Sequence, residues 1–217
     1  MRDRSRRFPS RLGLMIALLG LTSLSLQAQT IKLPPPQTDG GIPLMQALKA
    51  RRSSRAFLSK PLPDQTLSNL LWAAFGVNRP DGRRTAPSAH NWQEIDIYVA
   101  RADGLYLYLP KEHALQLVLK EDVRGLTGVQ EFVREAPVNL IYVADFDRMK
   151  GATEEDKQFY SAADTGFIAQ NVYLFCASEG LATVVRGTID RPKLAAKMGL
   201  RPAQRITLAQ TVGFPKE

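Results

Sequence analysis

Apolar residues recur with a helical period in the first part of the chain. Around residues 44–50, and again over residues 64–75, leucine and alanine return every three or four positions, which predicts two amphipathic helices. We expect Asp64 to be the N-cap of the second helix, because a short polar side chain can accept a backbone N–H there. We expect Gly76 to end the same helix.

A much longer helical pattern covers residues 154–179 and leaves few polar positions. A helix that is apolar nearly all round is buried, either in a core or in a subunit interface. Small side chains would let another helix approach closely, and they are Ala162, Ala163, Gly166 and Ala169. Cys176, the only cysteine, is interpreted as a small core residue of this helix.

Between the helical patterns the period changes to two. Residues 95–99 alternate as in a half-buried strand, and Asp103-Gly104 provides a tight turn into a second strand at 105–109. Residues 137–144 are apolar enough to form a central strand. Other elements are expected at 181–185 and 205–212 (strands) and near 190–198 (a helix). Hairpins mixed with helices, without regular strand–helix–strand alternation, favour the α+β class.

The first 28 residues have the organisation of a secretory signal peptide. Five arginines and one aspartate in residues 1–11 precede an apolar run over residues 12–26, and small residues follow. The run is short for a membrane span, which needs roughly 20 apolar residues. We therefore expect cleavage after Ala28, export to the periplasm or the cell exterior, and no stable membrane anchor. An uncleaved N-terminal anchor is the alternative interpretation.

Residues 29–41, rich in proline and glycine, are expected to form an extended leader, and residues 42–217 the folded domain. The net charge is +8, and residues 1–28 contribute five arginines and one aspartate, so +4 remains after cleavage. No stripe of basic and aromatic residues is present, which argues against a nucleic-acid partner. We expect neither an intramolecular disulfide nor a metal site, since there is one cysteine and His113 is expected on an exposed stretch.

Three segments carry residue types that could hold a ligand. Residues 51–55, Arg-Arg-Ser-Ser-Arg, offer guanidinium forks and hydroxyls that suit a phosphate, although basic turns are also common on surfaces. Residues 83–93 place hydroxyl, amide and aromatic side chains before a strand, where they could hydrogen-bond a polar ring system. In the third segment the long helix meets the glycine-containing turn at 180–187, which plain packing would also explain.

Together, the order and spacing of these segments resemble the nitroreductase superfamily of FMN enzymes. The resemblance rests on Arg-x-Ser-x-Arg at 51–55, Pro-Ser-x-x-Asn-x-Gln at 87–93 and Gly-Leu-Ala-Thr-x-x-x-Gly at 180–187, and it covers about residues 42–215. Ala-Pro-Ser-Ala at 86–89 looks most like the azoline-dehydrogenase branch. The resemblance implies a mostly antiparallel sheet flanked by helices, and a homodimer that binds FMN between its subunits.

The resemblance also implies which residues contact the cofactor. The FMN phosphate and the pyrimidine edge correspond to Arg51, Ser53 and Arg55, with Arg52 beside them. The ribityl chain and the isoalloxazine correspond to Ser88 and Asn91. The pair that faces the flavin N5 corresponds to Arg186 and Gly187. The flavin performs the redox chemistry, so no catalytic side chain is implied.

The chain departs from the family pattern in ways that leave its substrate open. Gln93-Glu94-Ile95 replaces the usual Gln-Pro-Trp, Arg186 stands where an acidic residue is common, and Lys216 alone is left of a late basic pair. A nitro- or quinone-like acceptor, azoline-type dehydrogenation of a small organic substrate, and a catalytically degenerate FMN-binding protein all remain open. The electron donor is open too, because NAD(P)H is not expected outside the cytoplasm.

Overall fold

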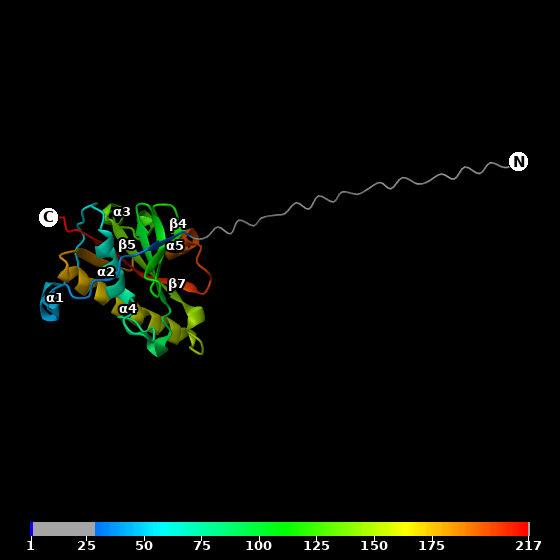
Figure 1. The fold of residues 1–217 in the computed structure, drawn as a ribbon, viewed down its shortest axis with the longest axis horizontal. Coiled ribbons are helices and arrows are strands. Elements are labelled where there is room, and N and C mark those ends of the chain that lie inside the picture. Colours follow the sequence, from blue (N-terminus) through cyan, green and yellow to red (C-terminus); the bar gives the residue numbers. More distant parts are fainter. Residues whose placement is uncertain (2–28, 217) are drawn as a thin grey trace.

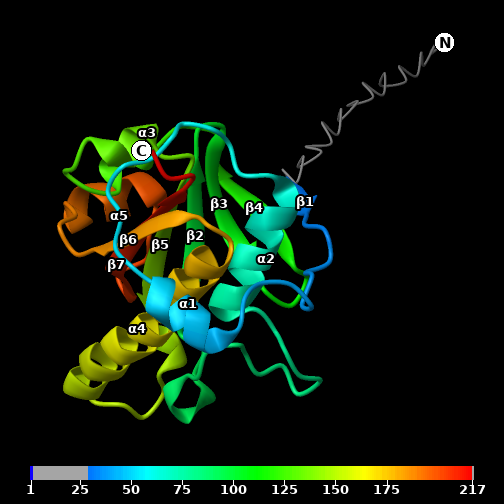
Figure 2. The same cartoon turned by 90° about the vertical axis from the view of Figure 1, so that its left-hand side faces the viewer.

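The computed structural model describes residue 1 and residues 29–216, so the predicted signal peptide beyond Met1 lies outside the described residues. Within the described part, seven strands form one sheet in the order β1-β4-β3-β2-β5-β7-β6, and all neighbours pair antiparallel. Figure 2 shows the succession from β1 through β4, β3 and β2 to β5 across the sheet. The strands are β1 Thr30–Lys32, β2 Ile95–Arg101, β3 Gly104–Leu109, β4 Ala114–Leu119, β5 Val138–Asp145, β6 Ala182–Arg186 and β7 Gln204–Gly213. The predicted α+β fold with a mostly antiparallel sheet is confirmed.

Five α-helices accompany the sheet in the described residues. They are α1 Leu44–Ala50, α2 Asp64–Phe75, α3 Phe132–Glu135, α4 Glu154–Ser178 and α5 Arg191–Met198. Gly76 ends α2 as expected, with its N–H donating to Trp72 O. The prediction of Asp64 as N-cap was wrong, because Pro63 is the cap and Asp64 is the first helical residue. There its negative charge still stabilises the positive end of the helix dipole.

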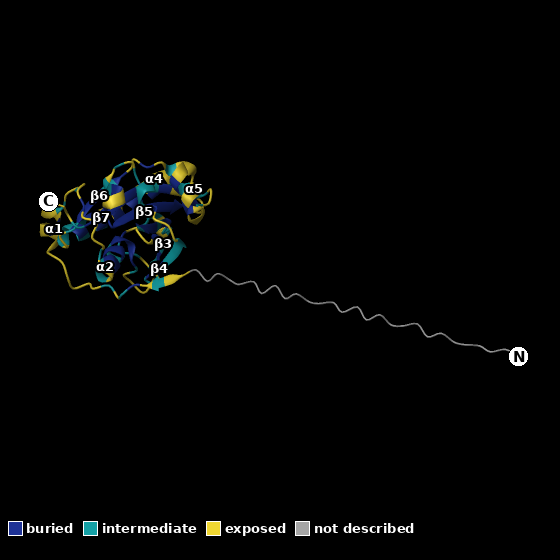
Figure 3. Ribbon diagram, turned by 90° about the horizontal axis from the view of Figure 1, so that it is seen from above, coloured by how far each residue is buried: buried dark blue, intermediate teal, exposed yellow. Residues whose placement is uncertain are grey.

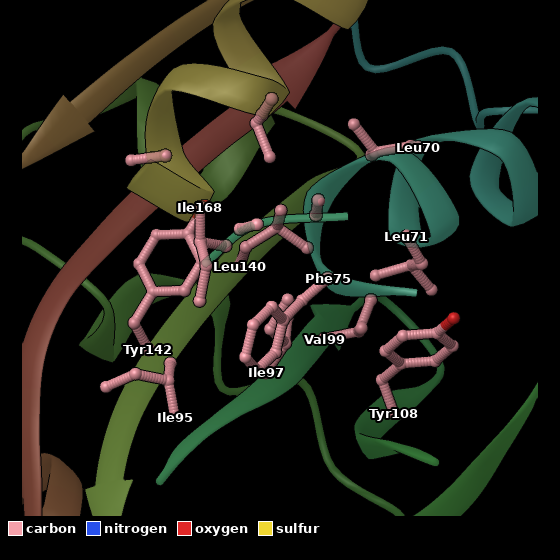
Figure 4. Close-up of a cluster of buried hydrophobic side chains, with 14 of the residues drawn as sticks. Leu70, Leu71, Phe75, Ile95, Ile97, Val99, Tyr108, Leu140, Tyr142 and Ile168 are labelled. Atoms are coloured by element: carbon pink, nitrogen blue, oxygen red, sulfur yellow. The ribbon is translucent and has the colours of Figure 1, made fainter. Parts of the chain in front are cut away.

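One face of the central strands packs against α2 and α4. Figure 4 shows side chains of β2 and β5 enclosed by residues from both helices. Those labelled are Leu70, Leu71, Phe75, Ile95, Ile97, Val99, Tyr108, Leu140, Tyr142 and Ile168. Burying one large apolar side chain contributes roughly 1.5–3 kcal/mol, so this cluster fixes α4 firmly against the sheet.

The other face of β2 is buried as well. Tyr98 and Ala100 pack in a second cluster with Leu194 and Met198 of α5. The expectation of a half-buried β2 was therefore wrong, because α5 covers the face that the alternation had left to solvent. All eight residues of β5 are buried, which confirms the prediction of a central strand.

Residues 29–41 are extended and lie against the domain (Figure 1). β1 pairs with β4 at the edge of the sheet, and the Ser68 hydroxyl of α2 donates to Pro34 O at 2.6 Å. His113 contacts this same hydroxyl through Nε2 at 2.7 Å and the Tyr108 hydroxyl through Nδ1 at 3.0 Å. The expectation that His113 lies on an exposed stretch was wrong, because the leader and α2 half-bury its ring.

The 25-residue helix α4 begins with a capping box formed by Thr153 and Asp156. Cys176 is completely buried, as predicted for a core residue. The opposite face of α4 is open in the single chain, where the Phe159 and Phe167 side chains are 67% and 49% exposed. Figure 3 shows the contrast between the buried sheet and the exposed parts of α1 and α4. No helix in the described part of the chain is long and apolar enough to cross a membrane.

Candidate functional site

Residues 51–55, here named the basic segment, leave α1 and run between α4 and β6. Ser54 N–H donates to Thr183 O of β6 at 2.9 Å, and the Arg51 guanidinium lies 5.2 Å from the centre of the Tyr173 ring of α4. The end of the chain joins the same place, because Lys216 N–H donates to Ala56 O. The backbone thus brings the only late basic residue of the family pattern beside the three arginines.

A pocket of about 470 Å³ opens where the basic segment meets α4 and β6. Its lining residues are Lys49, Ala50, Arg51, Arg52, Ser54, Tyr173, Cys176, Ala177, Gly180, Leu181, Ala182, Thr183 and Pro215. None of the described residues that line it is acidic. Among the described residues, Arg51, Arg52 and Arg55 pair with no carboxylate. Cationic forks without an internal partner suit an anionic group such as a phosphate.

Ser53 is held by a hydrogen bond to α4. Its hydroxyl lies 2.8 Å from the Tyr173 hydroxyl, which also accepts the Val185 N–H of β6 at 3.0 Å. A hydroxyl can donate once and accept twice, so Ser53 keeps capacity for a further contact. Tyr173 was not singled out from the sequence, where it was one of many apolar positions on the long helix.

The free edge of β6 points from the basic segment toward Gly187. Thr183 O and Val185 N–H both bond outward, away from β7, and alternate residues of a strand point their backbone groups to the same side. β6 ends at Arg186, and the carbonyl of the next residue, Gly187, accepts the Ile189 N–H. The four steps from Thr183 to Gly187 span about 13 Å at about 3.3 Å per residue.

Arg186 is placed differently from its neighbour. Its side chain is 6% exposed and donates to Thr127 O at 2.6 Å, to Asn139 Oδ1 at 2.9 Å and to Thr211 Oγ1 at 2.9 Å. Burial lowers the pKa of this guanidinium to about 10. The side chain is thus bonded to oxygens of β5, β7 and the 127 loop, which leaves only the Arg186 backbone for a cofactor.

Ser88 and Asn91 lie on a loop, residues 88–93, that passes α4 further toward its N-terminus. Ala89 N–H donates to Asp164 Oδ2 at 2.9 Å, and the Ser88 hydroxyl donates to Glu94 Oε2 at 3.2 Å. Asn91 is exposed and accepts Gln93 Nε2 at 2.9 Å. Loop 88–93 therefore presents Asn91 outward while its base is fixed by two carboxyl groups.

Aromatic side chains gather beside loop 88–93. The His90 and Trp92 rings lie 4.5 Å apart, and the Trp92 and Tyr160 rings 5.9 Å apart, with Phe159 next to Tyr160 at 5.3 Å. His90 and Phe159 are exposed. Such a cluster offers stacking surfaces for a flat ring.

The single chain does not bring the predicted site residues together. Loop 88–93 bonds to Asp164, whereas the basic segment bonds to Tyr173, nine residues later on α4. At 1.5 Å per residue the two attachment points are about 13.5 Å apart. Figure 1 shows α1, which leads into the basic segment, at one end of α4. The structure thus joins the basic segment to Lys216 and to Thr183 of β6, with Gly187 about 13 Å further along that strand, and attaches Ser88 and Asn91 to another part of α4.

Glu94 and Asp164 are features of the site that the sequence did not reveal as a pair. Glu94 is 0% exposed and Asp164 is 2% exposed. Burial raises the pKa of Glu94, and the negative charge of Asp164 adds to the rise. The resulting pKa is about 7. An acid within the apolar pattern of α4 was the available signal for Asp164. The described residues hold no group of three or more His, Cys, Asp or Glu side chains suited to a metal ion.

Comparison with protein families decides to which family the chain belongs. The model of the nitroreductase family matches residues 48–214, well over half of the chain. The chain belongs to the nitroreductase family. As a nitroreductase-family protein it is a flavin-dependent oxidoreductase. The predicted family and enzyme class are confirmed.

Individual relatives agree with this family. A provisionally named nitroreductase of Methanocaldococcus jannaschii is 36% identical over 156 residues, covering 67% of this chain and 79% of the relative. A crystal structure from Ralstonia eutropha JMP134, also provisionally named a nitroreductase, is 46% identical with a TM-score of 0.83, covering 87% of this chain and 90% of that chain. The FMN reductase (NAD(P)H) of Bacillus subtilis is 25% identical, and the match covers 67% of this chain and 54% of the reductase.

Proposed function

We propose that this protein is an exported FMN-dependent oxidoreductase that acts as a homodimer on a small organic substrate. The observation that carries the proposal is the pocket of the basic segment, whose lining among the described residues is free of acids and includes Ala182 and Thr183 of β6. FMN, when bound, supplies the redox chemistry by exchanging a hydride or electrons at N5. The protein's own residues bind it, orient it and shape the space above its ring.

The donor set fits the phosphate end of FMN. Arg51, Arg52 and Arg55 carry fixed positive charge without an internal carboxylate, and Ser53 is already oriented by Tyr173. Charge-assisted hydrogen bonds from such forks to a phosphate are stronger than neutral ones. We propose that the N–H of Gly187, about 13 Å beyond Thr183 at the end of β6, donates to a flavin nitrogen. For Arg186 we propose only a backbone contact.

A second copy of the chain would complete the site. Loop 88–93 and the basic segment are attached to α4 about 13.5 Å apart, and the face of α4 between them exposes Gly166 and Phe167. Two α4 helices that pack through this small-residue stretch would bring loop 88–93 of one protomer toward the basic segment of its partner. The exposed α1 side chains Leu44, Met45 and Leu48 extend the same apolar surface.

The aromatic cluster beside Asn91 favours a flat, conjugated substrate. His90, Trp92 and Phe159 offer ring faces and edges next to the loop that would hold the isoalloxazine. A nitroaromatic or quinone-like acceptor meets this description directly. Azoline-type dehydrogenation, suggested by Ala-Pro-Ser-Ala at 86–89, is the second reaction to test.

The spectrum of the natively purified mature protein tests the proposal. We expect a flavin absorbance that heat releases as free FMN, bleaching by a chemical reductant, and return of colour with a nitro or quinone acceptor. Export is tested by the N-terminus of protein from the periplasm or medium, which should be Gln29. A colourless protein that takes up no added FMN would overturn the cofactor assignment, and full-length protein retained in the cytoplasm would overturn export.

A catalytically degenerate FMN-binding protein is the alternative function. It is favoured by Arg186, which stands where the family pattern has an acid. The Arg186 side chain hydrogen-bonds to residues of the protein interior. Bound FMN that no donor reduces, including dithionite under anaerobic conditions, would support this alternative. Bleaching followed by substrate-dependent reoxidation would exclude it.

A further inference from the structure

Two buried carboxyl groups lie beneath loop 88–93 and bond to its backbone. Asp164 of α4 accepts the Ala89 N–H at 2.9 Å, and Glu94 accepts the Ser88 hydroxyl at 3.2 Å. The Ser88 oxygen in turn accepts the Gln93 N–H at 2.8 Å. Both ends of the loop are therefore attached to the carboxyl pair, one directly and one through Ser88.

Loop 88–93 needs such attachment because its backbone is unfavourable. His90, Asn91 and Gln93 have φ angles of 50°, 56° and 48°, in the left-handed region that residues other than glycine rarely adopt. Conformations of this kind persist only where surrounding contacts hold them. Loss of the attachments at Ala89 and Gln93 would let these residues relax to other conformations.

The two carboxyl groups also interact with each other. Their partners, the Ser88 hydroxyl and the Ala89 N–H, belong to adjacent residues, and the charge of Asp164 raises the pKa of Glu94. An ionised carboxylate can only accept, so two ionised groups could not bond to each other. Glu94 Oε1 is buried and receives no hydrogen bond from any donor in the described part of the chain. One proton shared between the two groups satisfies the contact and removes one of two adjacent buried charges.

The charged side chains near the carboxyl pair bond to residues other than Glu94 and Asp164. On β5, Asp145 gives only its backbone N–H to Glu94 O, and its side chain pairs with Arg148 and Arg201. Arg148 also pairs with Asp96 of β2, at 2.7 Å.

Near loop 88–93, the basic side chains likewise bond to residues other than Glu94 and Asp164. Arg148 donates to Gln93 O and Arg84 donates to Gln93 Oε1, and neither donates to Glu94 or Asp164. The imidazole of His90 is exposed and lies against Trp92, and Tyr160 of α4 stands beside both rings. Within residues 29–216, no cationic side chain thus bonds to the carboxyl pair.

We propose that Glu94 and Asp164 are positioning residues that share one proton, and that this protonated pair holds loop 88–93 in the conformation that binds the flavin and its substrate. The proposal rests on the proposed function, because that function places Ser88 and Asn91 against the cofactor. The proposal adds that binding of the flavin and its substrate depends on pH. Removing the shared proton leaves two adjacent carboxylates that repel, so loop 88–93 is released and ligands bind less tightly.

The pH range follows from the surroundings of Glu94. Burial, reinforced by the charge of Asp164, raises the pKa of Glu94 to about 7. The shared proton is therefore present in mildly acidic solution and lost as the pH rises through neutrality. For an exported protein, this is a range that the environment can cross.

Trp92 reports the state of loop 88–93 in protein without flavin. Its fluorescence is measured from about pH 5 to 9. The background is His90→Asn, because the imidazole ring 4.5 Å from the Trp92 ring would itself quench the fluorescence. Asparagine tolerates the left-handed backbone at this position. We expect a reversible change near pH 7 that disappears in the Trp92→Phe variant, which assigns the signal to Trp92.

Glu94→Gln separates the proposal from a general pH effect. The amide can accept from Ser88 and donate to Asp164 at every pH, so the fluorescence change should vanish. Glu112→Gln, the same substitution at an exposed carboxylate, should retain it. The FMN dissociation constant should rise severalfold from about pH 6 to 8 in the parent protein and stay level in Glu94→Gln.

The Trp92 fluorescence and the FMN dissociation constant test different parts of the argument. A Trp92 transition that persists in Glu94→Gln, or that is absent from the parent, overturns the carboxyl pair. Protein that binds no FMN at any pH overturns the proposed function, while the Trp92 transition still decides whether the pair controls loop 88–93.

Discussion

The Tyr173 hydroxyl lies 2.8 Å from the Ser53 hydroxyl and thereby links α4 to the basic segment. The same oxygen accepts the Val185 N–H of β6 at 3.0 Å, so one side chain holds the two borders of the pocket at a fixed separation. Arg51 lies over the ring of this tyrosine. Tyr173 therefore supports both the phosphate end of the proposed site and the edge that leads to Gly187.

Tyr173→Phe should lower both stability and FMN affinity. Tyr173 is 8% exposed, and without its oxygen the Val185 N–H loses its partner, which costs about 1–3 kcal/mol. The melting temperature should fall by roughly 2–4 °C per kcal/mol, and FMN should bind more weakly because Ser53 is no longer oriented. Thermal unfolding and FMN titration measure the two effects. Tyr106→Phe, which loses a bond to Asp103 at a surface turn, is the control and should change FMN affinity little.

Arg51→Ala should raise the FMN dissociation constant about tenfold or more, because it removes a charge-assisted contact to the phosphate. The measurement is quenching of flavin fluorescence, repeated at two salt concentrations, and the variant should show the weaker salt dependence. Arg83→Ala is a matched control, because Arg83 is an exposed arginine that pairs with Asp81 outside the pocket. Equal affinities for Arg51→Ala and the parent would overturn the phosphate assignment.

Arg186→Ala should be a stability variant. It leaves oxygens of Thr127, Asn139 and Thr211 without their donor in a buried region, at a cost of about 3 kcal/mol or more. We expect the melting temperature to fall by about 6 °C or more, with FMN affinity of the remaining folded protein close to the parent value. A variant that melts normally but loses FMN would show that the side chain contacts the cofactor.

Much of the fold could be predicted from periodicity. Apolar residues recur with the period of the element that buries them, and this spacing predicts the helices at 44–50, 64–75 and 154–179 and the central strand β5. The second face of β2 could not be predicted, because its burial depends on α5, an element far away in sequence. The sequence did not show that Pro63 rather than Asp64 is the N-cap of α2. Both residues suit the start of a helix, and only the backbone geometry distinguishes them.

The candidate site was predictable as a set of motifs but less so as an arrangement. Arginines and hydroxyls at 51–55 indicate an anion site by their chemistry alone. The sequence does not show that Arg186 turns inward, that Glu94 meets Asp164, or that loop 88–93 and the basic segment attach to different parts of α4. Each of these depends on contacts between segments that only the folded chain brings together.

Phe167→Glu should disrupt the proposed homodimer and FMN binding together. The Phe167 side chain is 49% exposed on the small-residue face of α4, and a charge there would be buried between two helices. Light scattering after size exclusion should show a dimer for the parent and a monomer for the variant, with loss of FMN. Val129→Glu, at another exposed apolar side chain away from α4, should stay dimeric and retain FMN. A monomeric parent that binds FMN fully would refute the shared site.

Glu94→Gln should make the protein more stable at alkaline pH and leave its stability nearly unchanged in acid. The pKa of Glu94 rises from 4.5 to about 7 on folding, so the folded state binds a proton that the unfolded state releases. The contribution of this proton to stability is therefore fully present below about pH 4.5 and is lost as the pH rises through about 7, by up to about 3 kcal/mol. The variant has no proton to lose at this position and should escape the decline. Urea unfolding at about pH 5 and pH 8 measures it, and a parent that loses no more stability than Glu94→Gln between these values would contradict the buried carboxyl pair.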